Sequence, residues 1–270
     1  MANDNHAKDS KPREEGGAHM TFFEHLTELR KRIINSLIAI ALGSFIGFYV
    51  ATRVIDWITR PMLQALASAH LDQKLVYTNP TGYLNLIITL GLYLGIVIAS
   101  PVVLYQIWLF VAPALYKHER KAVVAFLSST VFLFLAGIAF GYTIMLPYVL
   151  RFLVSFKGPV VPMISVNEYF DLILMVLLGL GVVFELPVLI FFLSLFGIVT
   201  PRFLWRNSKY AILIISIIAA IVTPTPDALT MLVFMSPMVG LYFFSIGVSA
   251  LVARRRAKRL AQSEAEAGAR

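Results

Sequence analysis

Long runs of apolar residues alternate with short polar segments along most of the chain. Five runs reach the roughly 20 residues that an α-helix needs to cross the hydrocarbon core of a bilayer. A sixth run, at residues 210–222, is shorter and is stopped by Pro224, because proline cannot continue the helical hydrogen-bond ladder. The pattern predicts an all-α bundle of six transmembrane helices with a short fifth helix. The five long runs are residues 33–52, 84–105, 122–147, 172–197 and 228–252.

Composition and charge support a polytopic membrane protein. Of the 270 residues, 59% are hydrophobic and 14% are charged, against about 25% charged residues in a typical soluble domain. With the amino terminus placed in the cytoplasm, 18 of the 23 Lys and Arg residues lie on the cytoplasmic side. Because basic residues accumulate in cytoplasmic loops, we expect both termini inside. The net charge of +8 is then an orientation signal, and we expect no nucleic-acid partner.

The two ends of the chain are polar. Residues 1–19 contain no apolar run and are expected to form a disordered tail. Residues 20–253 are expected to form the membrane domain. Residues 254–270 are expected to form a basic tail that needs no fold and touches anionic lipid headgroups.

Two short surface helices are expected beside the first span. Phe22, Leu26 and Leu29 recur at spacings of four and three residues, which predicts an amphipathic helix over residues 21–32. It is expected to lie along the cytoplasmic interface. The mixed apolar and polar residues 54–66 predict another short helix in the outer loop.

Glu185 is the one charged residue near the middle of a predicted span. A charged group at this depth costs roughly 2.5–3.5 kcal/mol on insertion scales, so we expect a partner, a wet cavity or a protonated carboxyl. Pro187 predicts a kink that frees a nearby carbonyl. Three roles stay open for Glu185. They are a structural hydrogen bond, a contact for a partner helix, and a proton carrier in an ion-coupled transporter of small solutes.

The sequence argues against an enzyme. There is no cysteine, and all five histidines lie outside the predicted spans, so neither a zinc-protease helix nor a serine–histidine protease in the bilayer fits. Asp171 and Asp227 lie only at helix ends, which disfavours an aspartyl protease. No Gly-rich phosphate loop occurs. We expect no cofactor and no metal site.

Two glutamates lie within basic segments on the predicted cytoplasmic side. Glu28 belongs to His25-Leu26-Thr27-Glu28-Leu29-Arg30-Lys31-Arg32, where a structural alternative is an ion pair with Arg32 one turn later. Glu119 belongs to Leu115-Tyr116-Lys117-His118-Glu119-Arg120. Its structural alternative is a place in the first turn of the third helix, where the helix dipole favours a carboxylate.

Taken together, these segments resemble the signature segments of the TatC family, the receptor and core of the twin-arginine protein translocase. The resemblance extends from Phe23 to about Val252. Further matching segments follow in the same order: Ser100-Pro101 with Tyr105-Gln106-x-Trp108-x-Phe110, then Phe184-Glu185-x-Pro187, and Thr223-Pro224-x-Pro226-Asp227.

The resemblance implies a cytoplasmic surface that binds the paired arginines of Tat signal peptides. The matching residues here are Glu28, Glu119, Phe110 and Arg30. A guanidinium suits a carboxylate better than an ammonium does, and Phe110 would pack against the apolar residues that follow the arginines. An interfacial aromatic anchor is the alternative for Phe110.

The resemblance also gives roles within the membrane. Glu185 matches the family's intramembrane glutamate, and Asp227 its acidic residue at the start of the last helix, where an N-cap is the alternative. Met231 stands where the family often has a glutamine, which puts in doubt any partner contact through that amide.

The implied function is export of folded proteins, driven by the proton-motive force, across a bacterial-type cytoplasmic (inner) membrane. The implied partners are the signal peptides of folded precursors, single-span subunits resembling TatA and TatB, other TatC copies and membrane lipids. We expect the single-span subunits along the last two helices, where the short fifth helix favours local thinning of the bilayer.

Overall fold

The computed structural model describes residues 22–111, 120–155, 163–223 and 227–268. Five helical stretches within these residues are long and apolar enough to cross a membrane, and the apolar helix Ser208–Val222 is shorter. An isolated parallel β-bridge joins Val76 to Ser165. In chain order the helices are α1 (Phe22–Ser68), α2 (Gly82–Val111), α3 (Arg120–Phe140), the π-helix η2 (Gly141–Met145), α4 (Leu146–Ser155), α5 (Val166–Val183), α6 (Leu186–Leu195), α7 (Pro201–Arg206), α8 (Ser208–Val222) and α9 (Ala228–Gly268).

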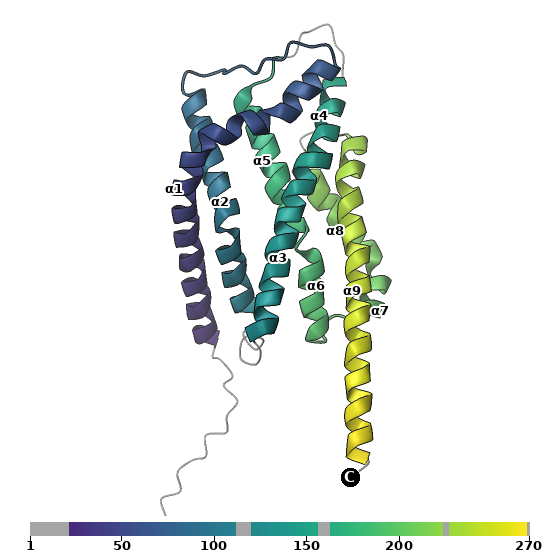
Figure 1. Cartoon of the computed structure of the whole chain (residues 1–270). Coiled ribbons are helices and arrows are strands. Elements are labelled where there is room, and N and C mark those ends of the chain that lie inside the picture. Colours follow the sequence, from purple (N-terminus) through teal and green to yellow (C-terminus); the bar gives the residue numbers. More distant parts are fainter. Residues whose placement is uncertain (1–21, 112–119, 156–162, 224–226, 269–270) are drawn as a thin grey trace, which may run out of the picture.

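The helix α1 is longer than predicted. It has 47 residues and joins the first span to the two surface helices expected at residues 21–32 and 54–66. Residues 22–32 are helical as predicted, but they belong to the same helix as the first span and do not form a separate one. No glycine or proline stands at either expected junction, so the helix has no reason to end there. Instead, the later part of α1 turns and crosses one end of the bundle (Figure 1).

Two tyrosines hold this crossing part of α1. Pro61 lies inside α1 and has no N–H, so the carbonyl of Trp57 loses its helical donor. Tyr142 donates its hydroxyl hydrogen bond to that carbonyl at 2.7 Å, and its ring stacks on Trp57 with the ring centroids 3.8 Å apart. Tyr169 donates to the next carbonyl, that of Ile58, at 2.6 Å. Side chains from η2 and α5 thus replace or supplement the helical bonds of α1.

The spans predicted at 122–147 and 172–197 both contain irregular turns. The wider turn of η2 lies directly before Pro147, where the missing proline N–H would otherwise interrupt an α-helix. The other span divides into α5 and α6 at Phe184 and Glu185, with Pro187 in the first turn of α6. The predicted kink at Pro187 is confirmed.

Matched small residues bring α1 and α2 into close contact along their length. A Cβ atom added to Gly47 would lie 2.2 Å from the carbonyl oxygen of Gly91, and one added to Gly95 would lie 2.6 Å from the Cα of Ser44. The two helices run side by side at one edge of the bundle (Figure 1). This packing places the start of α1 against the end of α2, where the candidate site lies.

The last two helices differ in length. With 15 residues, α8 is about 22 Å long at 1.5 Å per residue, less than the hydrocarbon thickness of about 30 Å. The prediction of a short fifth helix is confirmed. By contrast, α9 has 41 residues and continues as helix to Gly268, through residues expected to need no fold. The start of α1 and the end of α9 lie at the same end of the molecule (Figure 1).

Among the described residues, buried apolar side chains form three clusters. One, around Phe170, joins α1, α2, α4 and α5. Another, around Phe234, joins α4 to α9 through α5, α6, α7 and α8. The third lies around Trp108 and Phe192, whose rings stack with centroids 4.6 Å apart, and it supports the end of α2.

Candidate functional site

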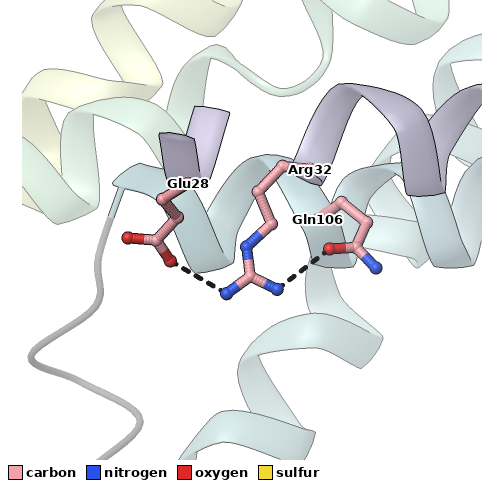
Figure 2. A network of polar contacts seen from close by, with 3 residues as sticks. All are labelled: Glu28, Arg32 and Gln106. Atoms are coloured by element: carbon pink, nitrogen blue, oxygen red, sulfur yellow. Dashed lines mark hydrogen bonds and ion pairs between the residues drawn. The ribbon is translucent and has the colours of Figure 1, made fainter. Parts of the chain in front are cut away.

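Three polar side chains meet where the start of α1 lies against the end of α2 (Figure 2). Arg32 donates from Nη2 to Glu28 Oε1 at 2.9 Å and from Nη1 to Gln106 Oε1 at 3.2 Å. Glu28 and Arg32 are one helical turn apart, so the ion pair weighed from the sequence is confirmed. Gln106 comes from α2 and makes this pair part of a contact between two helices.

This ion pair is largely shielded from solvent. The side chains of Glu28 and Arg32 are 17% and 22% exposed, and Gln106 is 9% exposed. Glu28 Oε2 and Arg32 Nε are buried without a hydrogen-bond partner among the residues that the structure describes. An unpaired buried polar atom costs about 1–3 kcal/mol, and more when it is charged. Glu28 therefore retains capacity for a further donor at Oε2.

An apolar groove continues from this network between α1 and α2. Phe110 forms part of its wall and stacks on His25, with ring centroids 4.4 Å apart and an interplanar angle of 20°. This stack joins the first turn of α1 to the last turn of α2. The groove has a volume of about 260 Å³ and is lined by Leu29, Arg32, Ile33, Ser36, Leu37, Val103, Gln106, Ile107 and Phe110.

Arg30 and Glu119 are the other two predicted binding residues. Arg30 is exposed on α1. Glu119 lies outside the described residues, so its position beside Glu28 stays a prediction. Arg120, the next residue, begins α3 at the same end of the bundle as the start of α1 (Figure 1).

Glu185 lies at the break between α5 and α6. Both of its carboxylate oxygens are buried, and neither has a hydrogen-bond partner within the described parts of the chain. The structural hydrogen bond considered from the sequence is not found there. Phe184 packs against Phe140 at 5.5 Å between ring centroids, and a Cβ atom on Gly137 would lie 2.9 Å from the Phe184 Cβ. Close apolar packing therefore surrounds the break that carries the carboxyl.

Asp227 caps the start of α9. Its Oδ1 accepts a hydrogen bond from the backbone N–H of Thr230 at 2.7 Å, which confirms the N-cap interpretation. Met231 packs against the apolar cluster around Phe234. Met231 is partly buried there and thus contributes to the interior of this chain.

Sequence reasoning missed two members of the site. Gln106 stood in a matching segment but had no role, although an amide near the end of an apolar span is itself a signal. His25 carried no signal for its stack on Phe110, since that contact joins residues far apart in the chain. The described residues contain no group of three or more His, Cys, Asp or Glu side chains able to hold a metal ion.

Comparison with known proteins identifies the family. The family model described as Sec-independent protein translocase protein (TatC) matches residues 24–237. The Sec-independent protein translocase protein TatC of Koribacter versatilis is 50% identical over 250 residues, which cover 92% of each chain. That of Aquifex aeolicus is 37% identical over 240 residues, covering 88% of this chain and 98% of the relative.

A solved structure agrees with the sequence comparisons. The crystal structure of the twin arginine translocase receptor TatC matches with a TM-score of 0.75 and 37% identity, covering 85% of this chain and 100% of that one. These matches favour protein translocation over the ion-coupled transport of small solutes, and they fit a multi-pass membrane protein. The chain belongs to the TatC family of Sec-independent protein translocase proteins and is a component of the Tat pathway.

Proposed function

We propose that this chain recognises the paired arginines of Tat signal peptides at the end of the bundle where α1 begins. The observation that carries the proposal is the bonding of Glu28. Arg32 holds one carboxylate oxygen, and the other is buried without a partner among the described residues. A guanidinium presents a planar fork of N–H donors that suits a carboxylate. An incoming arginine binds through both arms of this fork, with one N–H at the vacant Oε2 and the other at Oε1 in place of Arg32.

Binding of a signal arginine at Glu28 requires that it take the place of Arg32. Its guanidinium occupies the carboxylate that a signal arginine uses, and Gln106 offers Arg32 a second acceptor. As the peptide binds, Arg32 releases Glu28 and keeps its bond to Gln106. One guanidinium replaces another, so the partly buried carboxylate is never left without a cation. An ammonium is a compact point charge and substitutes poorly for the planar fork.

The apolar groove suits the segment that follows the arginines. Its walls come from α1 and α2 directly beside Arg32 and Gln106, so a peptide anchored at Glu28 continues along it. Phe110 provides an aromatic contact at this position. Glu119 is the proposed second carboxylate, and Arg30 contributes to the same surface.

The intramembrane residues are assigned to later steps. Neither oxygen of Glu185 has a partner among the described residues, so we assign it to a polar group on a partner helix or on the inserted signal. Pro187 opens the helix at that point, and Asp227 fixes the start of α9. One bundle of this size is too small to enclose a folded protein, so transport requires assembly.

The proposed assembly face is formed by α8 and the start of α9. Subunits resembling TatA and TatB, and further TatC copies, are the proposed partners, and the proton-motive force is the proposed energy source. Apolar side chains cover this face. Because α8 is shorter than the hydrocarbon core of a bilayer, the bilayer must become thinner around it. The apolar side chains include Leu213, Ile214, Ile217, Ile221, Leu229 and Leu232.

The proposed location is the cytoplasmic (inner) membrane of a bacterial-type cell, with both ends of the chain in the cytoplasm. The excess of Lys and Arg on that side supports this orientation. The signal-binding end then faces the compartment in which precursors fold.

Site-specific photocrosslinking tests the proposed site. A photoreactive residue at Leu29 or Phe110 should capture an Arg-Arg signal peptide, and the capture should fall when Glu28→Gln is added. A photoreactive residue at Tyr83, half-exposed at the opposite end of the bundle, is the matched control and should capture none. Equal capture of Arg-Arg and Lys-Lys peptides, or equal capture at Tyr83 and Phe110, would contradict the proposal.

A further inference from the structure

A polar cavity lies at the other end of the bundle, remote from Glu28. It has a volume of about 240 Å³ and lies between the first turns of α2 and α5. The proposed signal-binding function makes no use of it. Its lining residues are Asn85, Leu86, Ile88, Thr89, Asn167, Phe170 and Asp171.

The polar residues of this cavity form two matched pairs. Asn85 and Thr89 are one helical turn apart on α2, and Asn167 and Asp171 are one turn apart on α5, so each pair shares a helix face. Asn167 Oδ1 is buried and has no hydrogen-bond partner among the described residues. Among the described residues, no Lys or Arg lines the cavity. It is therefore rich in acceptors and carries one negative charge.

The depth of the cavity points to a lipid. The spans begin at Gly82 and Val166, so the lining residues occupy the first two turns of each helix, at the level of lipid headgroups. Ile88 lines the cavity and is 49% exposed, and the neighbouring Tyr83 and Leu84 are also about half-exposed. An occupant can thus place a polar group in the cavity and its apolar part against α2.

We propose that this cavity binds the primary ammonium headgroup of a phospholipid such as phosphatidylethanolamine. An ammonium has three N–H donors. The Asp171 carboxylate supplies the charge and an acceptor, the unpartnered Asn167 Oδ1 supplies a second acceptor, and the oxygens of Asn85 and Thr89 lie in the same lining. A choline headgroup has the same charge but no N–H, so it cannot satisfy these acceptors.

A bound headgroup joins α2 to α5 at the end that the crossing part of α1 also covers. Asn167 and Val166 adjoin Ser165, which pairs with Val76 in the only β-bridge found among the described residues. The lipid would therefore strengthen the contact between two outer connections. A lysine of a partner protein also carries an ammonium group. We favour the lipid as the occupant, because the proposed assembly face lies on α8 and α9, away from this cavity.

Competition between lipids in native mass spectrometry tests the site. The full chain is delipidated in detergent and given equal amounts of phosphatidylethanolamine and phosphatidylcholine with identical acyl chains. We expect about fivefold more bound phosphatidylethanolamine at the first site filled, the factor that a net hydrogen-bond contribution of about 1 kcal/mol produces. N-methyl and N,N-dimethyl headgroups should give intermediate occupancies, in order of their remaining N–H donors.

Two variants locate the effect. Asp171→Asn keeps the shape of the side chain and should weaken the preference, because an amide oxygen accepts a weaker hydrogen bond than a carboxylate oxygen does. Glu168→Gln removes the same charge from an exposed position on α5 outside the cavity and should keep it. Equal occupancy across the methylation series would overturn the proposal, and so would a preference that Asp171→Asn leaves unchanged. The methylation series uses the unaltered protein, so misfolding of a variant cannot produce that result. Because no partner protein is present, a preference in this assay arises from the lipid itself.

Discussion

Arg32 and Gln106 meet across the α1–α2 contact at 3.2 Å, although 74 residues separate them in the sequence. This bond holds the Arg32 guanidinium beside Glu28 from a second helix, so the ion pair is fixed by more than the spacing of one helical turn. It also gives Arg32 an acceptor that stays available when a signal arginine binds Glu28 in its place. The exchange at Glu28 and its consequences depend on this geometry.

Removing Arg32 should strengthen peptide binding. In Arg32→Gln, the Arg-Arg peptide no longer competes with an internal guanidinium, so its affinity should rise about threefold to tenfold, as expected for loss of an ion pair of roughly 1 kcal/mol. Fluorescence anisotropy with a labelled peptide and purified protein measures the change. Lys31→Gln removes the same charge from an exposed neighbour and should leave the affinity nearly unchanged. A loss of affinity as large as that of Glu28→Gln would show that Arg32 shapes the site rather than competes for it.

The tyrosine that bonds the Trp57 carbonyl should contribute measurably to stability. Tyr142→Phe leaves that carbonyl without its hydroxyl donor, because Pro61 cannot supply an N–H. The expected loss is about 1–2 kcal/mol, seen as a lower midpoint of thermal unfolding in detergent. Tyr148→Phe, at an exposed position in α4, is the matched control. Equal midpoints for the two variants would mean that the bond to Trp57 does not support the bend of α1.

The close approach of α1 and α2 should not tolerate a methyl group. Gly47→Ala places a Cβ atom 2.2 Å from the Gly91 carbonyl oxygen, a backbone atom that cannot rotate away. We expect a destabilisation of about 1–3 kcal/mol, together with weaker peptide binding, since the same contact aligns Arg32 with Gln106. In Gly240→Ala the new methyl meets nothing within 4 Å, and we expect a gain of about 0.5–1 kcal/mol. Similar thermal midpoints for the two variants would contradict this role of the α1–α2 contact.

Glu185 should reduce the stability of the isolated chain while serving transport. Its two buried oxygens have no partner among the described residues, so Glu185→Leu removes an uncompensated polar group and should raise the thermal midpoint. Export of a folded reporter by cells that carry this variant should fall strongly. Glu168→Gln, at the exposed start of α5, should change neither quantity. A lower midpoint for Glu185→Leu would reveal a partner for the carboxyl within this chain.

Much of the bundle could be predicted because a span needs a long apolar run, and such runs are read directly from residue order. Pro187 and Asp227 were equally accessible, since a missing N–H and a helix cap act within a few residues. The continuity of the first span with the helices on either side of it is not predictable in the same way, because a change in polarity does not end a helix where no helix-breaking residue stands.

The site was only partly predictable for a related reason. Glu28 and Arg32 are neighbours on one helix, so their pairing follows from spacing alone. Gln106 and the His25–Phe110 stack depend on how closely α1 and α2 approach. That distance is set by glycines near the middle of both helices, whose role no local pattern reveals.

The central claim is that Glu28 reads the guanidinium of a signal arginine, and a double-mutant cycle tests it most directly. Affinities of Arg-Arg and Lys-Lys peptides are measured for the unaltered chain and for Glu28→Gln. We predict a coupling free energy of about 1.5–3 kcal/mol between the Arg-Arg to Lys-Lys change in the peptide and Glu28→Gln in the protein. Either change alone removes the same hydrogen bond between a guanidinium and a charged carboxylate. A coupling near zero, with Glu28→Gln weakening both peptides equally or neither, would contradict the account.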